Sequence, residues 1–376
     1  MIWLDSAATS FQKPAEVRRA VWNAMTRLSS PGRGGYPSAM AAADTLFRCR
    51  CALGQMFGVE EPERVVFTSS ATHGLNIALK SLVRPGDRVV ISGYEHNAVV
   101  RPLYAMGADV FVASSPLFDR AAAVEAFRRA LPGAKAAVCC HVSNVFGFAL
   151  PLEEIAALCQ AEGVPLIVDA AQSAGVLSLD VGALGCAFAA MPGHKGLLGP
   201  QGTGVLLCGS ADAAPLMEGG TGSDSENASM PDYLPDRLEA GTHNVPGIAG
   251  LLAGVEWLRK QGVDNVRARE SAMRRRLSDA LSGIPGLRLF EAKEDAAQTG
   301  VLSLCLDDLD PEIAAELLGE RDIAVRAGLH CAPLAHRTAD TLQTGTLRLS
   351  VSPFTTEEDV GRAAEAIRAV VVGAVG

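Results

Sequence analysis

The sequence predicts an α/β protein in which helices cover a mainly parallel sheet. Short apolar runs alternate with segments of helical periodicity, which is the pattern of parallel strands joined by crossover helices. The run Val164–Asp169 is apolar until its final acid, as expected of a strand buried on both faces. A chain of 376 residues with 48% hydrophobic content is too long for one compact core, so we expect two domains.

The larger domain is expected over residues 15–255. Its first helix begins with a proline, which suits the first turn of a helix. The helices are predicted at 14–28, 39–57, 75–82, 119–130, 151–162 and 247–260. The strands are predicted at 64–67, 88–92, 109–113, 136–140, 164–169, 186–190 and 203–208.

The smaller domain is expected over residues 256–376. Helices are predicted at 263–281, 311–320 and 356–372, and strands at 300–306 and 346–351. The stretch 326–331 is predicted to be a loop.

Composition excludes several functional classes. The net charge of −9 and the absence of a basic block argue against nucleic-acid binding, and no apolar run approaches the length of a membrane span. The N-terminus lacks the basic and apolar regions of a signal peptide, so we expect a cytoplasmic protein. Nine cysteines without a disulfide pattern fit a reducing compartment. Cys49–Cys51 and Cys139–His141 lack zinc-ligand spacing, so we expect buried packing there and no metal site.

A lysine set among glycines, prolines and apolar residues is the first candidate for chemistry. Lys195 lies within Met191–Gly204, where it has few charged neighbours and where burial would disfavour an ammonium. A neutral amine is a nucleophile toward aldehydes, so Lys195 is suited to form a Schiff base. The alternative is a glycine-rich surface loop with one solvated lysine.

An acid at the end of a buried strand favours the first interpretation. Asp169 ends the run Val164–Asp169, and ligands of α/β sheets bind at the carboxyl ends of strands. An aspartate there can pair with the pyridinium nitrogen of pyridoxal 5′-phosphate (PLP) and keep the ring protonated as an electron sink. There is room for one more strand before Lys195, so we expect both residues at the ends of successive strands.

Several stretches together carry a family resemblance. They are Asp169–Gln172, Gly193–Lys195, Tyr94–Ala98, His141–Asn144 and Arg326–Ala332. The sequence resembles the class V aminotransferases of PLP fold type I, and among them the group II cysteine desulfurases and selenocysteine lyases. The resemblance covers nearly the whole chain. It implies a large domain with a mainly parallel, seven-stranded sheet and a smaller α+β C-terminal domain on which residues 1–14 pack.

A strand, a polar turn and a helix over residues 64–82 are suited to bind the phosphate of PLP. Backbone amides at a helix N-terminus point at an anion, and hydroxyl groups add donors. We expect Thr72 to bind the phosphate and Ala71 to contribute its amide. The alternative is ordinary helix capping by a serine or threonine.

Two residues depart from the family pattern at this end of the site. Relatives usually have Glu where His73 stands, and Ser or Thr where Pro192 stands. Because proline has neither an amide hydrogen nor a hydroxyl, we expect fewer phosphate contacts unless a neighbouring hydroxyl compensates. The candidates for this compensation are Thr68, Ser69 and Ser70.

The resemblance implies the remaining contacts to PLP. Lys195 would form the Schiff base and act as general base at the substrate Cα, and Asp169 would bind the ring nitrogen. The other implied cofactor contacts are His96 over the ring and as a proton carrier, Asn144 and Gln172 at the phenolic oxygen, His194 at the phosphate, and Thr242 at the phosphate of the partner in a homodimer.

An arginine matches the family's binding residue for the substrate carboxylate. Arg348 lies in the predicted strand 346–351, and its planar guanidinium suits a carboxylate. Its apolar neighbours argue against a surface position. Asn144 and Arg326 are further expected substrate contacts, and Arg33 is either another contact or an ordinary loop residue.

A cysteine decides which reaction is expected. Cys331 stands in a turn that is neither apolar strand nor helix, and nearby Arg326 favours its thiolate electrostatically. Attack of that thiolate on the sulfur of L-cysteine would give L-alanine and a persulfide on Cys331, for transfer to a sulfur-acceptor protein. The alternative for the residue is a buried structural cysteine.

The catalytic set Lys195, Cys331 and His96 therefore predicts a PLP-dependent cysteine desulfurase. Three alternatives remain open at this stage. They are a lyase for L-selenocysteine, another class V enzyme such as a transaminase or epimerase, and a non-catalytic sulfur carrier or scaffold.

Overall fold

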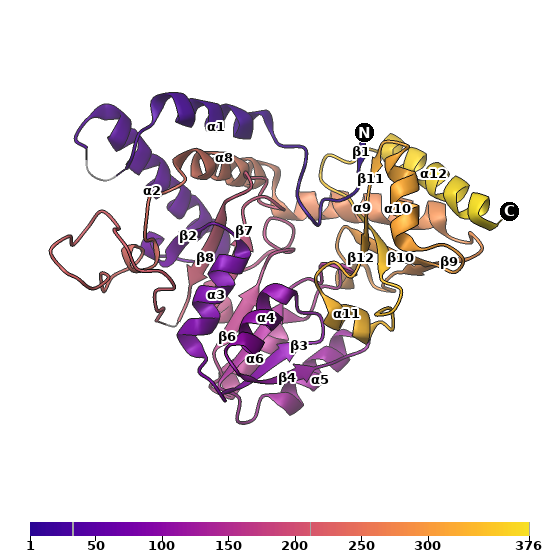
Figure 1. The fold of residues 1–376 in the computed structure, drawn as a ribbon, viewed down its shortest axis with the longest axis horizontal. Coiled ribbons are helices and arrows are strands. Elements are labelled where there is room, and N and C mark those ends of the chain that lie inside the picture. The colour runs from indigo at the N-terminus through magenta and orange to yellow at the C-terminus, as the bar shows by residue number, and fades with distance from the viewer. Residues whose placement is uncertain (32–33, 211, 376) are drawn as a thin grey trace.

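The two parts of the chain are each built on their own sheet. The computed structural model describes residues 1–31, 34–210 and 212–375, so the candidate Arg33 lies outside the described residues. A seven-stranded sheet organises the larger part and a four-stranded sheet the smaller part, and the two parts lie beside one another in Figure 1.

The large sheet is parallel except for one strand. Its order is β2-β8-β7-β6-β5-β3-β4, and only β8 runs against its two neighbours. The strands are β2 (Val65–Thr68), β3 (Arg88–Ser92), β4 (Asp109–Ala113), β5 (Ala136–Cys140), β6 (Leu166–Asp169), β7 (Phe188–Pro192) and β8 (Gly204–Cys208). Cys140 pairs with Asp169, and Asp169 pairs with Ala190, so the carboxyl ends of three strands lie side by side.

Helices cover both faces of this sheet because alternate strand residues point to opposite sides. Val138 and Ile167 join one buried cluster with α3 and α4, whereas Ala137 and Val168 join a second cluster with α2, α5, α6 and α8. The helices of the large part are α1 (Ala15–Arg27), α2 (Pro37–Phe57), α3 (Ala71–Leu82), α4 (Asn97–Ala105), α5 (Arg120–Ala130), α6 (Leu152–Ala161), α7 (Val181–Leu184) and α8 (Val245–Gln261).

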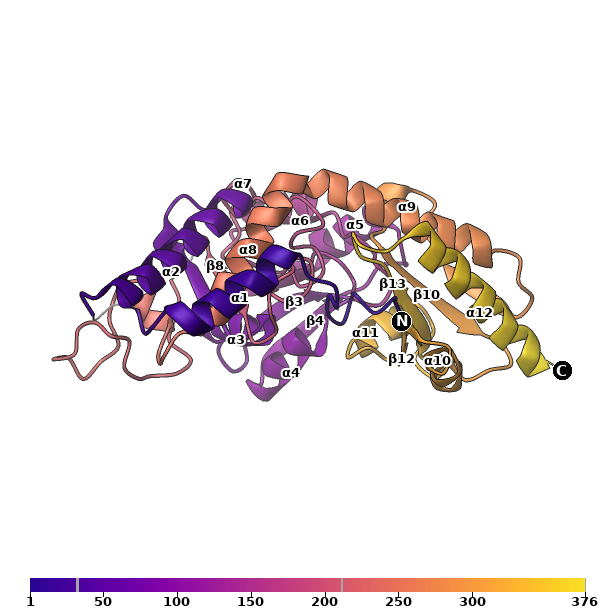
Figure 2. The ribbon, with the colours of Figure 1, turned by 90° about the horizontal axis from the view of Figure 1, so that it is seen from above.

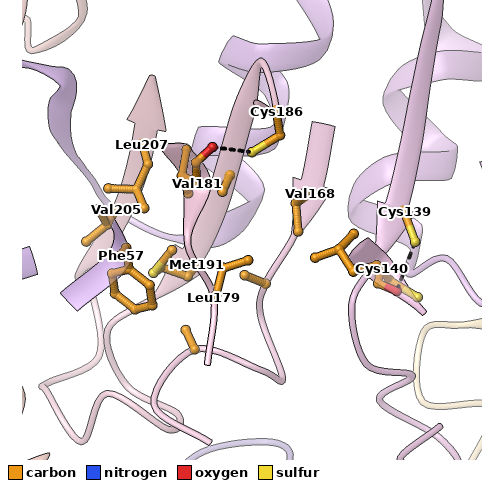
Figure 3. Close-up of a cluster of buried hydrophobic side chains, with 14 of the residues drawn as sticks. Phe57, Cys139, Cys140, Val168, Leu179, Val181, Cys186, Met191, Val205 and Leu207 are labelled. Carbon is orange, nitrogen blue, oxygen red and sulfur yellow. Dashed lines mark hydrogen bonds between the residues drawn. The ribbon is translucent and has the colours of Figure 1, made fainter. Parts of the chain in front are cut away.

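Figure 3 shows part of the second cluster, where Phe57 from α2 faces Met191 of β7 and Val205 and Leu207 of β8. Cys139 and Cys140 lie in this cluster at the end of β5 and are almost completely buried. Burial raises the pKa of both thiols well above the usual thiol range. They are therefore neutral packing residues, as their apolar strand predicted.

The small part holds an antiparallel sheet in the order β12-β13-β10-β9. Its strands are β9 (Leu287–Phe290), β10 (Val301–Leu306), β12 (Arg326–Gly328) and β13 (Thr346–Ser350), and its helices are α9 (Val263–Leu281), α10 (Pro311–Gly319), α11 (Pro333–Thr338) and α12 (Glu357–Val375). The predicted loop at 326–331 thus begins with a strand, whose edge pairing with β13 no local pattern revealed. Seen from above in Figure 2, α8 and α9 follow one another and join the two parts.

The N-terminus packs on the small part. Strand β1 (Ile2–Trp3) pairs in parallel with β11 (Ile323–Ala324), and Ile2 and Leu4 join the apolar cluster of the small sheet. The domain boundaries at 14/15 and 255/256 stay a prediction, and the second falls inside α8.

Candidate active site

A pocket at the carboxyl edge of the large sheet gathers the predicted cofactor residues. Its empty space is about 580 Å³, part of it open to solvent, and it is lined by all of them except Thr242, namely Ala71, Thr72, His96, Asn144, Asp169, Gln172, His194 and Lys195. They come from the ends of β2, β3, β5, β6 and β7, which the parallel sheet brings to one edge.

Lys195 follows β7 and lines this pocket, and its side-chain amine has no hydrogen bond or ion pair to any residue that the structure describes. Burial lowers the pKa of its amine to about 8, although Asp169 opposes the shift. The Asp169 carboxyl accepts a hydrogen bond from the Ala171 amide at 2.9 Å, and burial raises its pKa. The site therefore holds an amine that is readily deprotonated near a carboxylate that Lys195 helps to keep charged.

His96 presents one defined tautomer to the pocket. Its Nδ1 accepts a hydrogen bond from the Ala98 amide at 3.0 Å and so caps α4, which leaves the proton of the neutral ring on Nε2. Burial, followed by the positive charges of Lys195 and nearby arginines, lowers the pKa of His96 to about 4. The ring is thus neutral near pH 7.

The N-terminus of α3 provides an anion-binding end for the pocket. The Ser70 hydroxyl caps the helix by accepting from the His73 amide at 3.1 Å. The amides of Ala71 and Thr72 have no hydrogen-bond partner among the described residues, and both residues line the pocket. The cap is thus Ser70, which leaves the amides of Ala71 and Thr72 available to a ligand.

The hydroxyl groups expected to compensate for Pro192 are mostly engaged elsewhere. Pro192 is the last residue of β7 and lines the pocket. Thr68 donates to the Ser70 carbonyl, and Ser69 contacts the His73 ring. Of these three candidates, only Ser70 lines the pocket.

The N-terminal segment supports Gln172 and the turn that carries His194 and Lys195, a role that the sequence did not reveal. The Gln172 side chain donates to the Ala7 carbonyl at 2.8 Å, and His194 Nδ1 lies 3.0 Å from the Thr9 hydroxyl. Ser10 and Lys13 both donate to the His194 carbonyl. No local signal marks these residues, because the contacts join segments far apart in the chain.

Arg348 does not line this pocket but is bonded to Asn144, which does, and its guanidinium is fixed by two hydrogen bonds. It donates to the Asn144 carbonyl at 2.9 Å and to Asp5 at 2.7 Å, and its Nε is buried without a partner. Arg348 is only 2% exposed, so it is not the surface residue of the alternative interpretation. Arg326 lies opposite it on β12, and the Asn144 amide donates to the His330 carbonyl.

Cys331 is the exposed cysteine among the described residues, and its loop is bonded to segments that carry two lining residues of the pocket, His96 and Asn144. Its carbonyl accepts from the Asn97 amide, next to His96, at 2.8 Å. The preceding residue, His330, is bound by Asn144. The alternative of a buried structural cysteine is therefore wrong for Cys331.

Thr242 lies outside this pocket, in a neighbouring cavity that Ser69 and His73 also line. Its segment is anchored by the buried carboxylate of Glu239, which pairs with Arg50 through both oxygens and lies 2.6 Å from His243. Although burial raises the pKa of Glu239, the hydrogen bond to His243 and the charge of Arg50 hold it below its usual range. The described chain alone does not bring Thr242 to the predicted phosphate end.

A second cavity of about 460 Å³ lies on the other side of Lys195. It is lined by Ser6, Gln172, Ser350 and Glu270, among others. Glu270, on α9, is 7% exposed, and its carboxyl has no hydrogen bond or ion pair among the residues described. Burial raises its pKa from 4.5 to about 8, so its carboxyl is a neutral acid at neutral pH.

Replacing Glu270 with Gln should shift the slope of the free energy of unfolding against pH in the positive direction. Between pH 4.5 and 8 the folded state keeps this proton and the unfolded state releases it. The contribution of Glu270 to the free energy of unfolding therefore falls as pH rises, by up to about 1.4 kcal/mol per pH unit. Urea unfolding at several pH values measures this slope. The exposed Glu365→Gln should keep the wild-type slope, and an unchanged slope in Glu270→Gln would contradict the assignment.

Comparison with known proteins identifies the family. The model of the class V aminotransferases matches residues 2–362. The chain belongs to this family. A probable cysteine desulfurase of Methanothermobacter thermautotrophicus is 32% identical over 374 residues, covering 96% of this chain and 92% of that relative. The cysteine desulfurase of Synechococcus elongatus is 31% identical and covers 99% of the chain, which spans 61% of that longer protein.

Solved structures confirm the fold class. The cysteine desulfurase of Thermococcus onnurineus NA1 matches with a TM-score of 0.89 and 26% identity over 99% of this chain and 95% of that one. The cysteine desulfurase CsdA of Escherichia coli matches with a TM-score of 0.85 and 28% identity over 100% and 94%. Within the described residues, no helix is both long and apolar enough to cross a membrane.

Proposed function

We propose that this chain is a PLP-dependent cysteine desulfurase that converts L-cysteine to L-alanine and carries the sulfur as a persulfide on Cys331. The observation that carries the proposal is an exposed cysteine on a loop that is hydrogen-bonded to Asn144, which lines the pocket that holds Lys195 and Asp169, and to Asn97, next to His96. Relatives named cysteine desulfurases, similar over almost the full chain, support it.

The donor set fits PLP group by group. Lys195 offers an unpaired amine to the aldehyde, Asp169 a carboxylate to the ring nitrogen, and His96 a neutral ring to the aromatic face. Ala71 and Thr72 offer amides without a partner to the phosphate, and His194 lines the same pocket. When bound, PLP supplies the electron sink that makes bonds next to the substrate nitrogen labile.

The chain's own residues then divide the remaining work. Arg348 binds the substrate carboxylate, and its buried, unpartnered Nε is a donor for it. Lys195, with a pKa near 8, takes and returns the proton at the substrate Cα. His96 holds a proton on Nε2 at the same pocket. Cys331 Sγ receives the sulfur atom as the substrate C–S bond breaks.

We also propose that the active form is a homodimer that delivers sulfur to an acceptor protein in a reducing, cytoplasmic compartment. Large apolar side chains are exposed on α1 and α2, including Trp22 and Met25 at 67% and Phe47 at 55%. Such exposure on neighbouring helices is typical of a protein interface. A second chain would also give Thr242 a phosphate to bind. All nine cysteines are unpaired thiols, as a persulfide carrier in a reducing compartment requires.

The direct test of the reaction is to supply PLP and L-cysteine and to measure alanine and sulfide together in the presence of a reductant. Equal amounts of both products support a desulfurase. Formation of pyruvate together with sulfide would instead identify a β-elimination, and formation of a sulfur-containing keto acid without sulfide would identify a transamination.

Arg348→Lys should weaken substrate binding while leaving the cofactor in place. Lysine keeps the charge opposite Asp5 but loses the planar fork, so KM for L-cysteine should rise about 10- to 100-fold, the equivalent of roughly 1.5–3 kcal/mol. Steady-state kinetics measure this, with Arg288→Lys on the same small sheet as the control. An unchanged KM would remove Arg348 from the substrate site.

A further inference from the structure

The backbone of Cys331 and of the residue before it adopts an unfavourable conformation. His330 has φ 49° and Cys331 has φ 56°, so two successive residues other than glycine are left-handed. Such residues cost free energy and persist only where their surroundings hold them. The loop must therefore be fixed by specific contacts.

Three hydrogen bonds from three different elements supply these contacts. The His330 ring reaches β13, where its Nε2 lies 3.2 Å from both the carbonyl and the hydroxyl of Thr346. The His330 carbonyl accepts from the Asn144 side chain at 2.7 Å, and the Cys331 carbonyl accepts from the Asn97 amide at 2.8 Å. The ring bond is the one made by a side chain of the loop itself.

The tautomer of the His330 ring follows from its partner. The Thr346 carbonyl oxygen only accepts, and the Thr346 hydroxyl donates to Ser303, so we assign the proton to Nε2, which leaves Nδ1 buried without a partner. The ring is 6% exposed and stacks on His336 at 5.7 Å between centroids. Burial, with Arg348 and His336 nearby, lowers the pKa of His330 to about 2, so the ring stays neutral.

We propose that His330 is a positioning residue that sets the place of the Cys331 thiol by anchoring the loop to β13 at Thr346. This inference rests on the proposed function, in which Cys331 accepts sulfur. An S–S bond forms between Cys331 and the substrate sulfur as the substrate C–S bond breaks. The electron pair of that bond remains with the substrate carbon, which takes up a proton, so that L-cysteine and a thiol become L-alanine and a persulfide.

A second contact of His330, with Asn144, relates the thiol to the proposed site of the substrate carboxylate. Asn144 binds Arg348 through its backbone carbonyl and His330 through its side chain. The group that would hold the substrate and the loop that carries the nucleophile are thus fixed to one residue. Reacting atoms must be placed to within a fraction of an ångström, and a misplacement of ~1 Å can cost about 100-fold in rate.

Two amide variants separate the ring contact from the backbone conformation. His330→Gln keeps a donor near the position of Nε2, whereas His330→Asn places its amide near Nδ1, which has no partner. Asparagine tolerates a left-handed backbone better than glutamine. If the anchor matters, kcat should fall ~10- to 100-fold in Asn and less in Gln, with KM within about twofold of wild type. An Asn variant as active as Gln, or more active, would overturn the proposal.

A second readout does not depend on turnover. Loss of the anchor should release the Cys331 carbonyl, so the Asn97 amide should exchange with deuterium about 10-fold faster in His330→Asn and near the wild-type rate in His330→Gln. Leu329→Ala, a partly exposed neighbour outside the anchor, should leave exchange and kcat unchanged. Equal Asn97 exchange in the Asn variant and wild type would contradict the anchor.

The wild-type protein offers a third measurement if the variants do not fold. Nitrogen NMR of labelled histidine should find His330 neutral with its proton on Nε2 at pH 6, whereas a ring protonated on Nδ1, or one titrating near pH 6.5, would refute the anchor. If wild type makes no alanine from L-cysteine, the proposed function fails, and the exchange and NMR measurements still decide whether His330 anchors the loop.

Discussion

Lys195→Ala should lose the covalent link to PLP and at least ~10²–10⁴-fold in turnover, because it removes both the amine that binds the aldehyde and the base at the substrate Cα. Borohydride treatment of wild type with PLP should fix the cofactor to one lysine. Peptide mass spectrometry of that product identifies which lysine it is, and the variant should give no product.

Lys13 is the natural competitor in this experiment. It is partly buried beside the His194 carbonyl, and burial lowers its pKa to about 8 as well. Lys195 faces the pocket, whereas Lys13 does not line it. Lys13→Gln should therefore still give the product on Lys195. A product on Lys13 in wild type would refute the proposed role of Lys195.

The pH dependence of the link follows from the lowered pKa of Lys195. At pH 7 about a tenth of an amine with a pKa near 8 is unprotonated, against roughly three in ten thousand for one at 10.5. The rate of covalent attachment should rise with pH through about 8 and then level off. A rate that keeps rising to pH 10 would show that burial does not shift this amine.

The sequence predicted the strands of the large sheet well because their signal is local. The predicted strand 136–140 has the bounds of β5, since a strand buried in a parallel sheet is a continuous apolar run. The predicted strand 109–113 also has the bounds of β4, although this edge strand is only partly buried. β9 and β12 were missed. β9 is only partly buried, and β12 is three residues long with a glycine, so neither shows an apolar run.

The site residues also differ in how far the sequence predicts their positions. Asp169 ends a strand, His96 and Lys195 follow strands, and the parallel topology alone brings strand ends to one edge of the sheet. The contacts of Asp5 with Arg348 and of Ser10 with His194 join the N-terminus to residues far along the chain, and no local sequence pattern predicts them. The early start of α3, at residue 71 where the prediction had 75, reflects the Ser70 cap within a run of small polar residues.

Cys331→Ala should stop alanine formation from L-cysteine while leaving the cofactor site intact. Cys331 does not line the pocket that holds Lys195 and Asp169, so PLP should bind with its wild-type absorption spectrum. L-cysteine should also still bind, because Arg348 is anchored by Asp5 and Asn144 rather than by the loop cysteine. Without a thiolate to accept the sulfur, turnover should fall at least ~10³-fold, to the background rate.

Cys51→Ala is the matched control for this experiment. Cys51 is the other cysteine with some exposure, but it lies on α2, away from the pocket, and its removal should leave alanine formation unchanged. Mass spectrometry after a single turnover should find one added sulfur on the peptide that contains Cys331 in wild type and in Cys51→Ala, and none in Cys331→Ala. Cleavage of L-selenocysteine by Cys331→Ala should keep part of its wild-type rate, because selenium is the better leaving group and needs less help from a nucleophile. A transaminase or epimerase would not respond to the change at all. Equal release of alanine from wild type and Cys331→Ala would therefore eliminate the desulfurase mechanism, while the family and the fold would stand.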